Sequence, residues 1–198
     1  MSDDNKILRY NNLAIAFHWI TALLFLILYF TVYYRRAFTV RGEWSNGILI
    51  RVHFFAGVLV LLIVILRIIW SRISPPPQFP KQPPLENFAK KTVQYILVFF
   101  MFFMPITGYL GTGTSFAPLS WIGIPEFYVT DTYIWLVEDG LGLEWVEFEK
   151  PVDFLHKMSG RFLVWFFILG HSGAALYHYF IRKDDMLQRM VPFLKRRK

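Results

Sequence analysis

Long apolar runs separated by polar segments dominate the chain. Four runs are long enough to cross about 30 Å of hydrocarbon as helices, which takes roughly 20 residues. They lie at about 13–34, 48–70, 93–111 and 156–181. This pattern predicts an all-α membrane protein, in which residues 1–198 form a single domain built on a four-transmembrane-helix bundle.

Two of the connecting segments are distinctive. The stretch "SPPPQFPKQPPL", residues 74–85, is rich in proline and predicts a linker that cannot continue a helix. Residues 112–155 are predicted to form a long outer loop that is acidic and aromatic. Two interpretations of its aromatic side chains stay open, a belt at the membrane interface or a docking surface for a redox protein. These side chains are Trp121, Tyr128, Tyr133, Trp135 and Trp145.

The charged residues predict an orientation. Four antiparallel spans put both ends of the chain on one side, together with the connection at 67–91. That side carries 14 of the 21 Lys and Arg residues but 5 of the 14 Asp and Glu residues. Because basic segments stay in the cytoplasm, we expect both the N- and C-termini to be cytoplasmic.

The composition agrees with a membrane protein and excludes several kinds of site. Hydrophobic residues make up 55% of the chain, and mean hydropathy is +0.39. The absence of cysteine excludes disulfides, thiolate metal sites, iron–sulfur clusters and covalently attached haem. The net charge of +7 is explained by the basic cytoplasmic segments, so we expect membrane lipid and not nucleic acid as a partner.

All five histidines lie in or at the end of a predicted span, where ionisable residues are expensive and usually functional. They are His18, His53, His156, His171 and His178. His156 and His171 are 15 residues apart, about 22 Å along a helix and on broadly the same face. This spacing puts His171 level with His18 near the inner face, and His156 level with His53 near the outer face.

Four of the histidines are followed by a small residue at position i+4, on the same helix face. These residues are Ala22, Gly57, Gly160 and Ala175, whereas Arg182 follows His178. A small side chain there leaves room for a flat, wide ligand beside the imidazole. His178 breaks the pattern, which indicates a different role.

Facing neutral imidazoles suit a six-coordinate haem b iron, so the pattern favours two haems b with His18, His53, His156 and His171 as axial ligands. Zinc normally takes four clustered ligands, and each level offers two. A proton relay stays open but does not explain the small residues. Arg51 and Arg161, close in sequence to His53 and His156, are candidates for pairing with haem propionates.

Several segments resemble the bacterial cytochrome b561 family of di-haem inner-membrane proteins. They are "RYNNLAIAFHWI", "RIIWSRISPPPQFP", "PITGYLGTG" and the most specific one, "HKMSGRFLVWFFILGHSGAALYHYFIRKDDMLQRMVP", with its H-x14-H-x6-H spacing. The resemblance implies two haems b, one held by His18 with His171 and the other by His53 with His156.

The same family includes superoxide oxidases, so the resemblance implies electron transfer from superoxide to ubiquinone in the membrane. His178, with Arg182 or Lys183 nearby, is a candidate for binding the quinone, although a capping or interfacial role for His178 stays open. Basic residues at the outer side can steer superoxide, while the acidic residues at 112–155 oppose it. The alternative is a cytochrome b subunit that serves a periplasmic redox protein or dehydrogenase.

Overall fold

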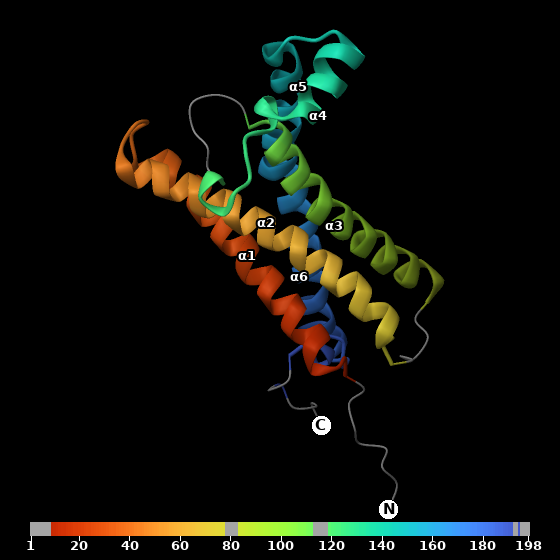
Figure 1. Ribbon diagram of the computed structural model, residues 1–198. Coiled ribbons are helices and arrows are strands. Elements are labelled where there is room, and N and C mark those ends of the chain that lie inside the picture. The colour runs from red at the N-terminus through yellow and green to blue at the C-terminus, as the bar shows by residue number, and fades with distance from the viewer. Residues whose placement is uncertain (1–8, 78–82, 113–118, 192–193, 195–198) are drawn as a thin grey trace, which may run out of the picture.

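The computed structural model describes residues 9–77, 83–112, 119–191 and 194, and every regular element within them is a helix. Three helices are long: α1 (Asn12–Phe38), α2 (Trp44–Ile73) and α3 (Pro84–Leu110). Each is long and apolar enough to cross a membrane. Figure 1 shows them running side by side in an elongated bundle with α6 behind them.

Compared with the apolar runs expected at 13–34, 48–70 and 93–111, α1 and α2 are longer at both ends, and α3 begins earlier and ends at Leu110. The side chain of Asn11 caps α1 by accepting a hydrogen bond from the Ala14 amide at 2.8 Å. Pro84 starts α3 well before its apolar part, at a position where its missing N–H costs nothing. Asn11 and Pro84 therefore mark where α1 and α3 begin, whereas hydropathy marks only the apolar part of each helix.

The predicted fourth span at 156–181 lies inside a longer helical run. This run consists of α5 (Trp145–Met158), η4 (Ser159–Leu163), α6 (Val164–Tyr177) and η5 (His178–Arg182). Both η4 and η5 are single π-helical turns, and the backbone stays right-handed at each junction. Such π turns are rare and occur often at functional sites; here one follows His156 closely and the other begins at His178.

The segment expected as an outer loop at 112–155 is largely helical in its described part. It contains η1, η2, α4, η3 and most of α5, the first four spanning Ser120–Ile122, Phe127–Val129, Asp131–Tyr133 and Ile134–Asp139. Phe127, Tyr133 and Val137 form a small core there, packed by Trp145 and Phe148. The aromatic residues fold this segment because they bury one another, which hydropathy along the sequence does not reveal.

This packing decides the role of some aromatic side chains. Tyr133 is buried and Trp145 is half-buried in the small core, so neither is mainly a membrane-interface or docking residue. Trp121 and Trp135 are exposed, so both original interpretations stay open for them.

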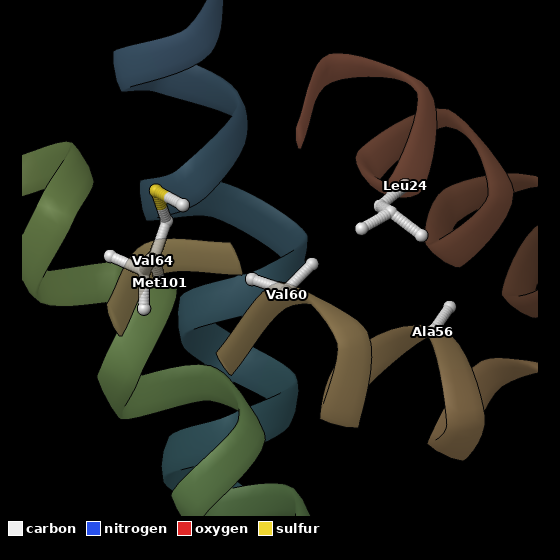
Figure 2. Packing of buried hydrophobic residues seen from close by; sticks show 5 residues of the cluster. All are labelled: Leu24, Ala56, Val60, Val64 and Met101. Atoms are coloured by element: carbon white, nitrogen blue, oxygen red, sulfur yellow. The ribbon is translucent and has the colours of Figure 1, made fainter. Parts of the chain in front are cut away.

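The bundle has its own core halfway along its length. Figure 2 shows Leu24 from α1, Met101 from α3, and Ala56, Val60 and Val64 from α2. The three α2 residues recur every fourth position, so they form one stripe that faces both neighbours. The helix faces that point away from the core expose large apolar side chains, such as Leu26 and Phe30 on α1 and Phe166 and Leu169 on α6. Exposed apolar surface of this extent fits a helical bundle surrounded by lipid.

The first and last described segments meet at one end of the bundle (Figure 1). The Arg9 guanidinium donates to the Leu194 carbonyl at 2.8 Å, and the Trp19 indole donates to the Met190 carbonyl at 2.8 Å. Residues 1–8 and 195–198 lie outside the described residues, as do residues 78–82 of the predicted linker. The cytoplasmic location of both termini therefore stays a prediction.

Candidate functional site

His18 on α1 and His171 on α6 face each other across the bundle. Their ring centroids are 6.2 Å apart, and the ring planes cross at 61°. Trp19, next to His18, is hydrogen-bonded to Met190, so this pair lies at the end where the described chain ends meet. We call His18 and His171 the inner pair.

His53 on α2 and His156 on α5 form a second pair with almost the same spacing. Their ring centroids are 6.3 Å apart, and the ring planes cross at 78°. His53 contacts Thr31 of α1, which is 13 residues beyond His18, or about 20 Å along the helix. We call His53 and His156 the outer pair. The structure thus brings together the four histidines in the two pairs that the sequence predicts.

The ring spacing in both pairs suits a metal ion between two imidazoles. Imidazoles bound on opposite sides of a metal, at about 2 Å from nitrogen to metal, have ring centroids roughly 6 Å apart. Among the described residues, no three His, Cys, Asp or Glu side chains gather around a common point. Each pair is therefore a two-ligand site, which suits a metal whose other ligands come from a macrocycle.

The outer pair is anchored to neighbouring helices through Nδ1. His53 Nδ1 lies 3.2 Å from the Leu28 carbonyl, and His156 Nδ1 lies 3.1 Å from the Met104 carbonyl. A carbonyl oxygen can only accept, so each Nδ1 carries the proton. Nε2 of each ring is then left with its lone pair, which is the form that binds a metal.

The inner pair has different neighbours. Within the part of the chain that the structure describes, neither His18 nor His171 is hydrogen-bonded through its ring. The Arg67 guanidinium on α2 interacts electrostatically with both rings and with Tyr10. Arg67 is half-buried and has no carboxylate partner among the described residues, so it can pair with an anionic group beside the inner pair.

The small residues next to the histidines differ in the space around them. A Cβ atom at Gly57 would meet nothing within 4 Å, so the backbone beside His53 is open as expected. At Gly160, a Cβ would lie 3.0 Å from Cε of Met104, which is the flexible end of a side chain. Gly108 on α3 makes room for a histidine ring on another helix, since a Cβ there would lie 3.1 Å from Cε1 of His156.

The three residues proposed for quinone binding lie near the inner pair in sequence, but they do not form one cluster. His178 Nδ1 lies 2.5 Å from Asp184 Oδ2, and Arg182 donates to Glu86 on α3 at 2.5 Å. Lys183 is exposed and has a left-handed backbone with φ of 57°, which ends the helical run. His178 therefore has an orienting carboxylate, whereas Arg182 is already paired.

The two arginines predicted to pair with propionates are both exposed. Arg51 lines a shallow cavity of about 290 Å³ on the surface of α2, together with Ile48, Val52, Phe55 and Trp121. The Arg161 guanidinium lies over the Phe162 ring, 5.3 Å from its centroid. Both side chains are close in sequence to an outer-pair histidine and reach the surface.

Sequence reasoning gave no role in the site to Thr31, Thr107, Arg67 and Asp184. Threonines are common in membrane helices, and only their packing against His53 and His156 makes these two stand out. The location of Arg67 could have been predicted from its spacing. It follows His53 by 14 residues, which places it on nearly the same face of α2 at the depth of the inner pair.

Comparison with known proteins identifies relatives that align with nearly the whole chain. The chain is 26% identical to cytochrome b561 homolog 2 of Escherichia coli K12, over 96% of this chain and 95% of the relative. It is 25% identical to cytochrome b561 homolog 1 of the same organism, over 93% of this chain and 97% of the relative. It is 27% identical to a probable superoxide oxidase CybB of Yersinia pestis, over 93% and 96%.

The family model for prokaryotic cytochrome b561 matches residues 9–193, which include all five histidines. Members of this family are membrane electron-transfer proteins that bind haem b, a group whose iron suits the paired imidazoles described above. The chain belongs to the prokaryotic cytochrome b561 family.

Proposed function

We propose that the chain is a di-haem b oxidoreductase that passes electrons from superoxide on the outer side of the bacterial inner membrane to ubiquinone. The observation that carries this proposal is the presence of two facing histidine pairs, 6.2 Å and 6.3 Å between ring centroids, about 20 Å apart along the bundle. His18 with His171 would hold one haem, and His53 with His156 the other.

The proposed topology has four crossings with both termini in the cytoplasm. The helical run from Trp145 to Arg182 is the fourth crossing, and its apolar part carries both His156 and His171. The excess of Lys and Arg on the side of the inner pair supports this orientation. The helical segment around Tyr133 then faces the periplasm.

When bound, haem b between two imidazoles carries one electron at a time and offers no open iron position to oxygen. The chain contributes the spacing and the surroundings. Four histidines hold the two positions, and the apolar core of Leu24, Val60 and Met101 separates them from each other. Two positions in series match a one-electron donor to a two-electron acceptor.

The reaction balances in electrons and protons. Two superoxide ions each lose one electron and leave as dioxygen, while ubiquinone takes both electrons and two protons to become ubiquinol. Arg51 and Arg161 are exposed and close in sequence to His53 and His156, and they would attract the anion or pair with haem propionates. The description of the Yersinia pestis relative as a probable superoxide oxidase supports this donor.

At the inner end, His178 is our main candidate for donating a proton to the quinone. Its Nδ1 is held by Asp184, which fixes the orientation of the ring and leaves Nε2 to face a ligand. Arg182 is paired with Glu86, so we assign it a supporting part, and Lys183 supplies positive charge beside it. This arrangement resembles a general acid with its orienting group.

A second function is supported by the acidic character of the outer segment. Residues 119–158 carry Glu126, Asp131, Glu138, Asp139, Glu144, Glu147, Glu149 and Asp153 against Lys150 and Lys157. Lys157 is paired with Asp153, and Trp135 is exposed on this segment. Such a surface suits a basic periplasmic redox protein or dehydrogenase, for which the chain would be the cytochrome b subunit.

The test is to mix the oxidised, purified holoprotein with potassium superoxide under anaerobic conditions and to follow the haem absorption bands. We expect fast reduction, then reoxidation when a short-chain ubiquinone is added. The double variant Arg51→Gln/Arg161→Gln should slow the reduction, whereas Arg72→Gln, far from the outer pair, should not. Bands that stay oxidised would contradict superoxide as donor and favour the protein partner.

A further inference from the structure

Two threonines occupy equivalent places against the outer pair. Thr31 Oγ1 on α1 lies 3.3 Å from His53 Nδ1, and Thr107 Oγ1 on α3 lies 3.2 Å from His156 Nδ1. Each threonine follows by three residues the carbonyl that the same Nδ1 contacts, Leu28 in one case and Met104 in the other. The same contact is therefore built twice, on two different helices.

The hydroxyl hydrogens are already used within the helices. Thr31 Oγ1 donates to the Leu28 carbonyl at 2.8 Å, and Thr107 Oγ1 donates to the Phe103 carbonyl at 2.7 Å. Because each hydroxyl directs its hydrogen to a carbonyl, its lone pairs are free to accept from the imidazole. Each Nδ1–H thus faces two acceptors, a carbonyl and a hydroxyl.

Both threonines are shielded from solvent, with exposed fractions of 3% for Thr31 and 7% for Thr107. A hydrogen bond in such surroundings is electrostatically stronger than one in water. A histidine that donates a strong bond from Nδ1 gains electron density at Nε2 and becomes a more basic metal ligand. The inner pair has no such bond among the described residues, so the effect is confined to one end of the bundle.

We propose that Thr31 and Thr107 are positioning residues that lower the reduction potential of the outer haem by accepting a second hydrogen bond from His53 and His156. A more basic ligand favours the oxidised iron, so the potential falls. The two contacts also fix the ring orientations. This inference rests on the proposed function, because it requires a haem at the outer pair.

The test uses the holoprotein and the variants Thr31→Val, Thr107→Val and their combination. Valine keeps the branched shape and removes the acceptor. We expect the midpoint potential of the outer haem to rise in each single variant and to rise further in the double variant. The inner haem should keep its potential, and the low-spin electron paramagnetic resonance signal of the outer haem should shift with ring orientation.

Two controls separate tuning from simple packing. Thr31→Ser and Thr107→Ser keep the hydroxyl and should stay close to the parent potential. Thr21→Val changes another buried threonine of α1, which donates to the Phe17 carbonyl and does not contact the outer pair, so it should leave the outer haem unchanged. An outer-haem potential that stays put in both valine variants would overturn the inference.

The haem content of the parent protein distinguishes this failure from failure of the proposed function. A parent protein without haem at the outer pair would contradict the proposed function itself. If the parent protein has two haems, and the potential and resonance signal of the outer haem are unchanged in both valine variants, only the tuning role is contradicted.

Discussion

The outer and inner histidine pairs have nearly the same ring spacing but very different surroundings. His53 and His156 each point Nδ1 at a carbonyl and a threonine hydroxyl on a neighbouring helix. His18 and His171 have no hydrogen-bond partner on the described chain and lie near the cation Arg67. The fold therefore fixes which ring nitrogen carries the proton in the outer pair. In the inner pair, the described chain does not fix it.

This difference fits the direction of electron flow that we propose. Ligands made more basic by hydrogen bonds lower a haem potential, whereas a nearby cation raises it. An electron would then move downhill from the outer pair to the inner pair, toward the quinone. The predictions below test the comparison between the pairs, beginning with the largest effect.

Replacing one histidine of a pair should remove one haem and spare the other. His53→Ala and His156→Ala should lose the same spectral component, and His18→Ala and His171→Ala should lose the other. His178→Ala should keep both, since its Nδ1 is bound to Asp184 and it belongs to neither pair. Redox-titrated absorption spectra measure this. If His53→Ala removed the component lost in His171→Ala, the pairing would be wrong.

The histidine pairs were accessible from the sequence because helix geometry alone fixes depth and face. Four spans of known direction and a rise of about 1.5 Å per residue suffice to put His18 level with His171. The contacts of the Thr31 and Thr107 hydroxyls with the outer-pair histidines could not be predicted from the sequence, because they depend on how α1 and α3 are rotated about their own axes. That rotation is set by packing around Val60 and Met101, which a sequence pattern does not specify.

The outer segment was the least predictable part of the fold. Its helices are short, and their apolar residues do not form a run that hydropathy can detect. Phe127, Tyr133 and Trp145 come together only when the short helices pack against one another, so the sequence pattern does not reveal this core. The hydropathy pattern predicts the fourth helical run only from His156 onward, because the first turns of α5, from Trp145, are too polar to be recognised as part of a span.

The next largest effect is expected for Gly108→Ala. The added methyl group would lie 3.1 Å from Cε1 of His156, and overpacking of this kind costs about 1–3 kcal/mol. The outer haem should be lost roughly tenfold more readily to a haem-scavenging apoprotein, and the inner haem should not change. Gly173→Ala is the matched control, since a Cβ there meets nothing within 4 Å. Equal retention in both variants would contradict the contact.

Asp184→Asn should slow quinone reduction without affecting either haem. The substitution removes the carboxylate that holds the His178 ring through Nδ1, so proton donation to the quinone should fall by roughly threefold to tenfold. Steady-state reduction of ubiquinone by the chemically reduced protein measures the effect. Asp185→Asn, the adjacent substitution, serves as the control. A loss of haem in Asp184→Asn would show that the carboxylate acts on the fold instead.

The smallest effect is expected at Arg67. Removing its charge in Arg67→Gln should lower the potential of the inner haem by about 1 kcal/mol, or ~40 mV for one electron. Arg67→Lys keeps the charge, so the inner haem should stay close to its parent potential. Arg72 is exposed on the same helix, and Arg72→Gln should have little effect on that potential. A shift of the outer potential in place of the inner one would contradict the location of Arg67.

The central claim is that each histidine pair holds one haem b. The most direct measurement is the ratio of haem to protein in the purified, unmodified chain, from the pyridine haemochrome spectrum and amino-acid analysis. We predict two haems b per chain. A ratio of one would leave one pair without its proposed role, and a chain without haem would contradict the account of both pairs.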